Sequence, residues 1–331
     1  MNTTLAPELL PQTGLAAITA LDAAAAPSLS VIPRTAGEAM DTSASAYGEL
    51  RRTSAALALH DPGELRRRMA EDGYLYIPGF FNRADVLRVR DDMLSRLAAA
   101  GALDAAFPSG PGDAKASATA VHVPRSAILS GESPLPSLVF SDQLLALYSR
   151  LLATAENPQP AIRHYDHIWL RLVRPGKGTL PHCDLPYMGR GTHNVFTAWI
   201  PYRDTSLKLG GLIILEKSHL QSHRIRAYLE SDVDTYCVNR GPYKHKHGLL
   251  SSNPATLREH FGGRWLTTEF RAGDLLTFGM SLIHASLDNQ TDEYRLSTDT
   301  RYQLAAEPID ERWVGPATEE YAEKNRIGKV C

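Results

Sequence analysis

The pattern of apolar and polar residues predicts a helix, a strand and a second helix between residues 61 and 100. The stretch "DPGELRRRMAED" begins with Asp61, a residue type that caps helices, and Pro62 suits the first helical position. Gly73 is expected to end this helix, and the apolar run "YLYIPGFF" predicts a strand after it. Residues 82–100 predict an amphipathic helix. Its apolar positions recur three or four apart on one face: Val86, Val89, Met93 and Leu97.

Residues 161–305 have a different pattern, in which short apolar runs are separated by turn residues. The runs are "HIWLRLV", "VFTAWIPY", "GGLIILE", "LTTEF", "DLLTFGM" and "YRLSTDTRYQ". Many short strands with few long helices between them favour a sandwich or barrel over βαβ units. We therefore predict a mainly β fold with flanking helices, of the α+β class.

Composition shifts suggest where the domain begins and ends. Residues 1–55 are rich in Ala, Ser and Thr, with no aromatic residue before Tyr47, and we expect a flexible or disordered arm there. The domain is predicted over residues 56–310. Within it, residues 232–264 look like an insertion at the rim of the active site, mostly loop with one short helix. Residues 311–331 are expected to form a C-terminal tail.

The overall composition excludes several classes of function. A hydrophobic content of 43% in 331 residues is typical of a globular protein with a sizeable core. A net charge of -2 offers no basic field for nucleic acid or anionic lipid, and no apolar run reaches the about 18 residues of a membrane helix. Three cysteines are too few for a disulfide framework. We expect a cytoplasmic protein acting on a small molecule; the sequence does not determine its oligomeric state.

Two histidines and an aspartate form a candidate metal site. In "PHCDLP", alternation along a strand would place His182 and Asp184 on one face. The best third ligand is His284, which follows the apolar strand in "GDLLTFGMSLIHASLDN". Two imidazoles and one carboxylate that leave other positions open suit non-haem Fe(II) and oxygen chemistry.

Other histidines compete for this role. His164 and Asp166 form a second His-x-acid triplet, beside Trp169 in an apolar run. His219 and His223 are four residues apart in a predicted helix, a spacing that can bind zinc, but no acidic residue or third ligand accompanies them. We favour a surface or capping role for that pair. The alternative for the candidate triad itself is a structural His–Asp hydrogen bond.

A polar strand lies close after His284. In "RLSTDTR", alternation places one face inward, with Arg295, Ser297, Asp299 and Arg301 on it. A guanidinium with a hydroxyl two residues on matches the distal carboxylate of a dicarboxylate. Arg301 and Asp299 are expected to pair with each other or to contact that dicarboxylate.

These segments together resemble the phytanoyl-CoA dioxygenase family of Fe(II)/2-oxoglutarate-dependent oxygenases, over roughly residues 61–305. The matching stretches are "EDGYLYIPGFFNRADVLRVR", "PHCD", "TAWIPYRDTSLKLGGLIILEKSH" and "AGDLLTFGMSLIHASLDNQTDEYRLSTDTRYQ", the last with a His-x10-Arg-x-Ser spacing. One departure is Glu216-Lys217, where proline-glycine is usual.

The resemblance implies a fold, a site and a reaction. The fold would be a double-stranded β-helix (a jelly roll, cupin-like). His182, Asp184 and His284 would bind Fe(II), and a second group would hold the co-substrate 2-oxoglutarate: Arg295 as the clamp, with Ser297, Thr197 and Trp199. With O₂, the enzyme would hydroxylate a C–H bond of a small metabolite and decarboxylate 2-oxoglutarate to succinate. The alternatives are a jelly-roll metalloprotein without 2-oxoglutarate, such as a cupin-like isomerase or dioxygenase, and a non-catalytic binding module.

Overall fold

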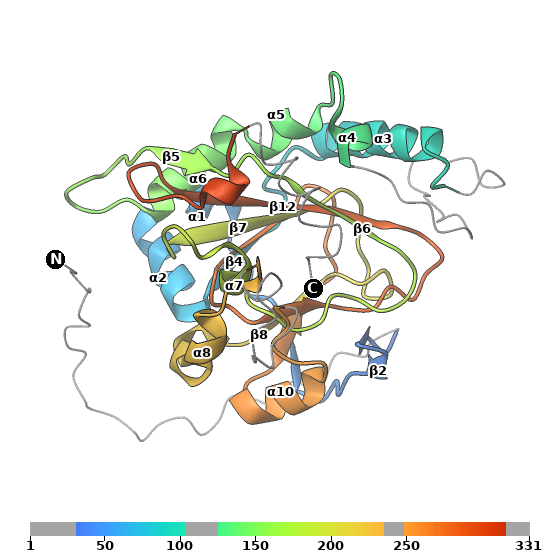
Figure 1. Ribbon diagram of the computed structural model, residues 1–331. Helices are drawn as coiled ribbons and strands as arrows, with labels where there is room; N and C mark the ends of the chain where they lie inside the picture. The colour runs from blue at the N-terminus through green and yellow to red at the C-terminus, as the bar shows by residue number, and fades with distance from the viewer. Residues whose placement is uncertain (1–30, 104–124, 235–247, 316–331) are drawn as a thin grey trace.

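The computed structural model describes residues 31–103, 125–234 and 248–315 (Figure 1). In these ranges two β-sheets form the centre of the molecule and most helices lie outside them. No helix in the described ranges is both long and apolar enough to cross a membrane. The predicted mainly β fold with flanking helices is confirmed.

The larger sheet is antiparallel and is built around its longest strand, β12. Its path runs β4–β10–β7–β12–β5, and β6 also pairs with β12. The strands are β4 (Tyr74–Ile77), β5 (Ile162–His164), β6 (Trp169–Val173), β7 (Val195–Pro201), β10 (Leu275–Gly279) and β12 (Arg295–Leu304). Because β12 pairs with β5, β6 and β7, it brings side chains from distant parts of the sequence together.

The smaller sheet has the order β11–β8–β9–β3. Its strands are β3 (Tyr47–Glu49), β8 (Leu212–Leu215), β9 (Trp265–Thr267) and β11 (His284–Ser286). An aromatic contact joins the two sheets, since the ring of Phe278 in β10 lies 4.6 Å from that of His284 in β11, measured between centroids.

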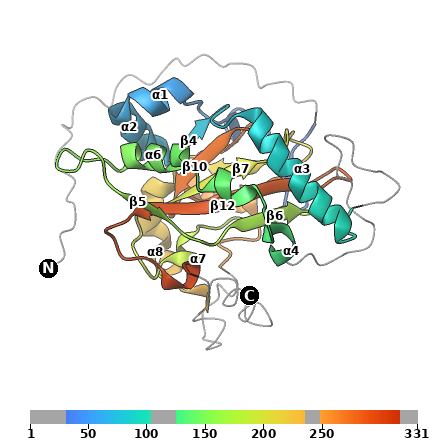
Figure 2. The ribbon, with the colours of Figure 1, turned by 90° about the horizontal axis from the view of Figure 1, so that it is seen from above.

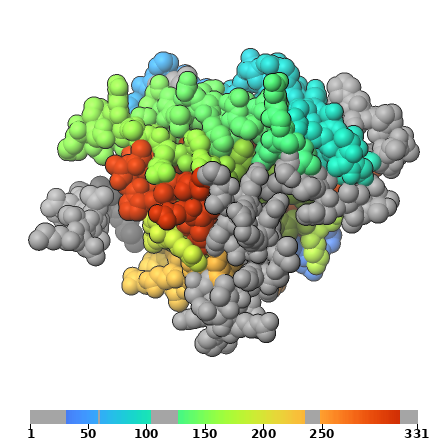
Figure 3. All heavy atoms as spheres, turned by 45° about the horizontal axis from the view of Figure 1, so that its top comes forward, coloured from blue at the N-terminus to red at the C-terminus, as the bar shows by residue number. Residues whose placement is uncertain are grey.

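Helices cover the outer face of the larger sheet, as Figures 1 and 2 show. They are α1 (Ala55–His60), α2 (Pro62–Asp72), α3 (Arg83–Ala99), α4 (Arg125–Leu129), α5 (Leu135–Val139) and α6 (Asp142–Leu151). In Figure 3, the helices drawn in cyan and green form one outer layer. The predicted apolar face of α3 is confirmed, because all four of its expected residues are buried in the main hydrophobic cluster.

The predicted ends of α2 are also confirmed. The Asp61 carboxylate accepts a hydrogen bond from the Glu64 backbone N–H at 2.9 Å and so satisfies one of the free donors at the helix start. Gly73 ends the helix with a φ of +79°, in the left-handed region that glycine adopts readily.

The segment before α1 differs from the expected arm. Residues 1–30 lie outside the described residues, but β1 (Arg34–Thr35) and β2 (Glu38–Ala39) form a hairpin, and β3 pairs in parallel with β9. Tyr47 and Leu50 are only 4% and 3% exposed. The expectation of a mobile arm is therefore wrong for residues 34–50, because a three-residue strand carries too short a pattern to be recognised.

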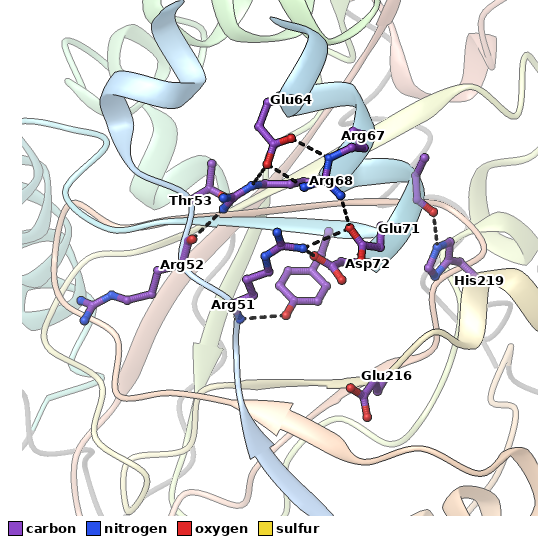
Figure 4. Close-up of polar contacts among 12 residues, drawn as sticks. Arg51, Arg52, Thr53, Glu64, Arg67, Arg68, Glu71, Asp72, Glu216 and His219 are labelled. Atoms are coloured by element: carbon purple, nitrogen blue, oxygen red, sulfur yellow. Dashed lines mark hydrogen bonds and ion pairs between the residues drawn. The ribbon is translucent and has the colours of Figure 1, made fainter. Parts of the chain in front are cut away.

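Polar contacts fix the same segment to α2 (Figure 4). Arg51 lies 3.2 Å from the Glu71 carboxylate and 3.1 Å from that of Asp72, and its backbone N–H donates to the Tyr74 hydroxyl. Arg68 donates to the Arg52 carbonyl at 2.9 Å. Residues 51–53 are thus part of the packed domain.

The described part of the expected insertion at 232–264 includes the helix α10 (Pro254–Phe261). Leu257 and Phe261 of α10 are buried in the core cluster around the smaller sheet. The Leu250 N–H donates to the Pro181 carbonyl at 2.9 Å, so this end of the insertion lies beside the candidate metal ligands. Residues 235–247, and residues 316–331 of the expected tail, lie outside the described residues.

The turn at Glu216-Lys217 keeps the backbone that glycine would adopt. Lys217 has a φ of +55°, in the left-handed region, while the Glu216 carboxylate pairs with Arg264 at 2.7 Å. Left-handed backbone costs an L-residue with a Cβ about 1–2 kcal/mol. Lys217 therefore holds a strained position in which glycine would be relaxed.

We expect Leu50→Ala to lower the free energy of unfolding by about 2–5 kcal/mol, because it leaves a cavity beside β9. Chemical denaturation measures this. Glu49→Ala, at the exposed last residue of β3 next to Leu50, is the control and should stay within about 0.5 kcal/mol of wild type. Equal and negligible effects of both substitutions would contradict the docking of this segment.

We expect Lys217→Gly to raise the free energy of unfolding by about 0.5–1 kcal/mol, because it removes the backbone strain. The matched control is Lys208→Gly, at an exposed position with ordinary φ, which should be neutral or destabilising. Thermal denaturation of both variants tests this, and a lower melting temperature for Lys217→Gly would refute it.

Candidate metal centre

Backbone pairing places the two histidines of the candidate site opposite each other. His182 and His284 form an isolated antiparallel bridge, in which each N–H donates to the other's carbonyl at 3.0 Å. Their ring centroids are 4.2 Å apart. Ser218 supports this arrangement, because its Oγ accepts a hydrogen bond from the Ile283 N–H, next to His284.

Both imidazoles are held in the same tautomer. Nδ1 of His182 lies 2.8 Å from the Leu180 carbonyl, and Nδ1 of His284 lies 3.1 Å from the Leu282 carbonyl. A carbonyl only accepts, so each Nδ1 carries the proton and each Nε2 presents a lone pair. Burial lowers the pKa of His182 to about 3, which keeps it neutral as a metal ligand must be.

Asp184 completes the group at the start of a helical turn. It precedes α7 (Leu185–Met188) with helical backbone angles, so the predicted strand does not extend to it, although its side chain still meets the histidines. Its Oδ1 lies 3.9 Å from Nε2 of His182 and 3.7 Å from Nε2 of His284. Burial opposes ionisation of this carboxyl, but the charge of Arg301 and the hydrogen bond from Thr197 hold its pKa well below the usual range.

The three side chains fit a divalent iron ion. One ligand atom from each lies within 4.8 Å of the others, and all three residues are buried. Two neutral imidazoles and one carboxylate on one side, with the rest of the coordination sphere open, form the donor set of non-haem Fe(II) sites. No other three His, Cys, Asp or Glu residues meet in this way within the described ranges.

Beside the triad, one pocket contains both histidines and the predicted clamp. Its lining residues are Arg171, Thr179, His182, Thr197, Trp199, Leu212, Phe278, His284, Arg295, Asp299 and Arg301. Arg295 is 1% exposed, and burial lowers its pKa to about 10. It donates from Nη1 to the Gly210 carbonyl at 3.0 Å.

Several polar atoms around Arg295 have no hydrogen-bond partner among the described residues. They are Nε of Arg295, Oγ of Ser297 and Nε1 of Trp199. An unpaired buried donor costs about 1–3 kcal/mol, and more when charged. Such a cluster is what a site for a polar or anionic ligand requires, and a dicarboxylate is a suitable match.

The structure corrects one detail of the polar strand and adds another. The expected pairing of Arg301 with Asp299 is wrong: Asp299 accepts from Nε of Arg171 at 2.7 Å, and Arg301 donates to Asp184 at 2.8 Å. Thr197, predicted to contact the co-substrate, lines the pocket and donates to the same Asp184 oxygen at 2.6 Å. Register explains this, because Arg301 lies opposite Thr197 in the β7–β12 ladder.

The competing histidines have other roles. The His164 ring stacks on the Phe140 ring with their centroids 3.9 Å apart. Its Nδ1 lies 3.5 Å from Oδ1 of the partly exposed Asp166. Nε2 of His219 donates to the Ala70 carbonyl at 3.0 Å, a contact that links η1 (Ser218–Ile225) to α2 (Figure 4). Both contacts are structural, in keeping with the preference for the central triad.

We expect Asp184→Asn to weaken Fe(II) binding by at least about 100-fold, because it removes the one anionic ligand; even groups that merely hold ligands contribute about 10–100-fold. Anaerobic equilibrium dialysis of the apoprotein measures this. The control is Asp166→Asn in the competing pair, which should bind Fe(II) as wild type does. If Asp166→Asn lost Fe(II) binding while Asp184→Asn bound Fe(II) as wild type does, the metal site would be assigned to His164 and Asp166 instead.

Comparisons with known proteins agree with this geometry. The family model described as phytanoyl-CoA dioxygenase (PhyH) matches residues 69–297. No curated protein sequence matches the chain. Among solved structures, the α-ketoglutarate-dependent carbocyclase SnoK of nogalamycin biosynthesis is 18% identical, with a TM-score of 0.53, and the match covers 85% of this chain and 95% of that one.

A second solved structure is the epimerase SnoN in complex with Fe3+, alpha ketoglutarate and nogalamycin RO. It is 22% identical with a TM-score of 0.49, and the match covers 75% of this chain and 85% of that one. The likeness to SnoK supports the expected double-stranded β-helix core. Since the family model spans more than half of the chain, the protein belongs to the phytanoyl-CoA dioxygenase (PhyH) family of iron- and 2-oxoglutarate-dependent oxygenases.

Proposed function

We propose that the protein hydroxylates a C–H bond of a small organic metabolite, with Fe(II), O₂ and 2-oxoglutarate, and converts 2-oxoglutarate to succinate and CO₂. One observation carries this proposal. Arg295 and Trp199, each with an unpaired polar atom, line the same pocket as both histidines of the triad, and the Ser297 hydroxyl, two residues along β12 from Arg295, is also unpaired among the described residues. A metal ligand set and a carboxylate clamp in one pocket are the two elements that this reaction needs.

Each part of the pocket has a role in this proposal. When bound, iron and 2-oxoglutarate would activate O₂, which is the oxidant: it takes two electrons from 2-oxoglutarate and two from the C–H bond. His182, Asp184 and His284 hold the metal from one side and leave the other side for ligands. Arg295 binds the far carboxylate, and the Ser297 hydroxyl assists it, so that the dianion is oriented with its other end toward the triad.

The two alternatives are less well supported by the same residues. A jelly-roll metalloprotein that uses no 2-oxoglutarate has no need of a buried guanidinium whose Nε has no hydrogen-bond partner among the described residues, because its desolvation is costly. A non-catalytic binding module has no need to keep two buried imidazoles in the same tautomer beside a buried carboxylate. Desaturation or ring closure starts from the same C–H bond cleavage, and identification of the product separates these outcomes from hydroxylation.

We expect Arg295→Gln to weaken 2-oxoglutarate binding by about 30-fold or more, because it removes the charged partner of a buried carboxylate. Anaerobic titration of the Fe(II)-loaded protein, followed by the visible charge-transfer band of the chelate, measures this. Fe(II) affinity should stay unchanged. The control is Arg90→Gln, a buried arginine of α3 that pairs with Asp91 and does not line the pocket.

A missing band in Fe(II)-loaded wild type, together with no detectable 2-oxoglutarate binding by calorimetry, would reject the proposed co-substrate. The protein would then be a jelly-roll metalloprotein of another kind. Wild-type affinity for 2-oxoglutarate in Arg295→Gln would reject only the role of Arg295 in binding the far carboxylate.

A further inference from the structure

The two oxygens of the Asp184 carboxylate have different surroundings. Oδ1 faces the Nε2 atoms of His182 and His284, at 3.9 and 3.7 Å. Oδ2 accepts two short hydrogen bonds, from Thr197 Oγ1 at 2.6 Å and from Arg301 Nη2 at 2.8 Å. One oxygen is thus available to a metal ion, and the other is already bound within the protein.

The two donors are built into the fold. Arg301 and Thr197 are partners in the β7–β12 ladder, so both side chains reach the same oxygen from adjacent strands. Both residues are 1% exposed, and the Arg301 guanidinium lies 4.6 Å above the Trp169 ring, which fixes its plane. Because Asp299 pairs with Arg171, the ion pair that the structure gives Arg301 is with Asp184.

We propose that Arg301, together with Thr197, is a positioning residue that restricts Asp184 to a single metal-binding oxygen. The inference rests on the proposed metal site. Carboxylates bind cations through one or both oxygens. A second oxygen would occupy one of the coordination positions that the co-substrate and O₂ require, so a chelating Asp184 would hold the metal firmly and bind 2-oxoglutarate poorly.

This role predicts opposite effects on two affinities. Arg301→Met removes the charge and the donor but keeps a long side chain over Trp169. The Asp184 carboxylate then loses its cationic partner, and its Oδ2 keeps only the hydrogen bond from Thr197, so that this oxygen can turn to the metal. We expect Co(II) affinity of the apoprotein to stay equal or rise, while the Co(II)-loaded protein binds 2-oxoglutarate about tenfold more weakly or worse.

Two further variants keep the test decisive if Arg301→Met does not fold. Arg301→Lys retains the charge and one donor, and should restore most of the 2-oxoglutarate affinity. Thr197→Val removes the other donor at nearly constant volume, and should show the same pattern as Arg301→Met with a smaller loss of about two- to fivefold. Circular dichroism checks the fold of each apoprotein before titration.

A general packing role would give a different result. The proposal would be overturned if, in both Arg301→Met and Thr197→Val, the affinities for Co(II) and 2-oxoglutarate fell in parallel. It would also be overturned if both affinities stayed at wild-type values in these variants. The visible spectrum of bound Co(II), which reports coordination number, adds an independent reading: it should change in Arg301→Met before any 2-oxoglutarate is added. If wild type binds Co(II) but no 2-oxoglutarate, the proposed function fails, while the Co(II) affinity and spectrum of the variants still decide the role of Arg301.

Discussion

The site depends on one backbone interaction, the reciprocal pair of hydrogen bonds between His182 and His284. These residues are far apart in sequence, and each comes from a different segment at the edge of the smaller sheet. An antiparallel hydrogen-bonded pair sets the separation and direction of two side chains that project to the same side. The carbonyls two residues upstream of each histidine then fix both tautomers, so the rings need little rearrangement to bind a metal.

Charge compensation is the second constraint on the pocket. Three lining arginines, Arg171, Arg295 and Arg301, face two aspartates, Asp184 and Asp299, in surroundings where unpaired charge is costly. Asp299 is bound by Arg171 and Asp184 by Arg301, which leaves Arg295 without a carboxylate partner among the described residues. A divalent metal adds further positive charge. A dianionic ligand that reaches from the metal to Arg295 is the natural complement of this arrangement.

The sequence predicted the element order well where the pattern was long and failed where it was short. The α3 face and the caps of α2 follow from residues close together in the chain, so local physics determines them. Strand β3 has three residues and gains its stability from β9, more than 200 positions later, and this pairing leaves no local signal. The polar strand β12 was placed correctly, yet the partners of Arg301 and Asp299 were not, because alternation gives the face of a side chain and not its neighbour across the ladder.

The sequence by itself determined the residue types of the site, since a His-x-Asp pair, a later histidine and an Arg-x-Ser pair at their spacings indicated metal and carboxylate chemistry. It also determined the mainly β class, through the period of its apolar residues. Only the tertiary structure decided which oxygen of Asp184 faces the histidines, and that Arg301 and Thr197 hold the other. The physical reason is that hydrogen-bond geometry across a sheet depends on register, and long-range packing of the two sheets sets that register.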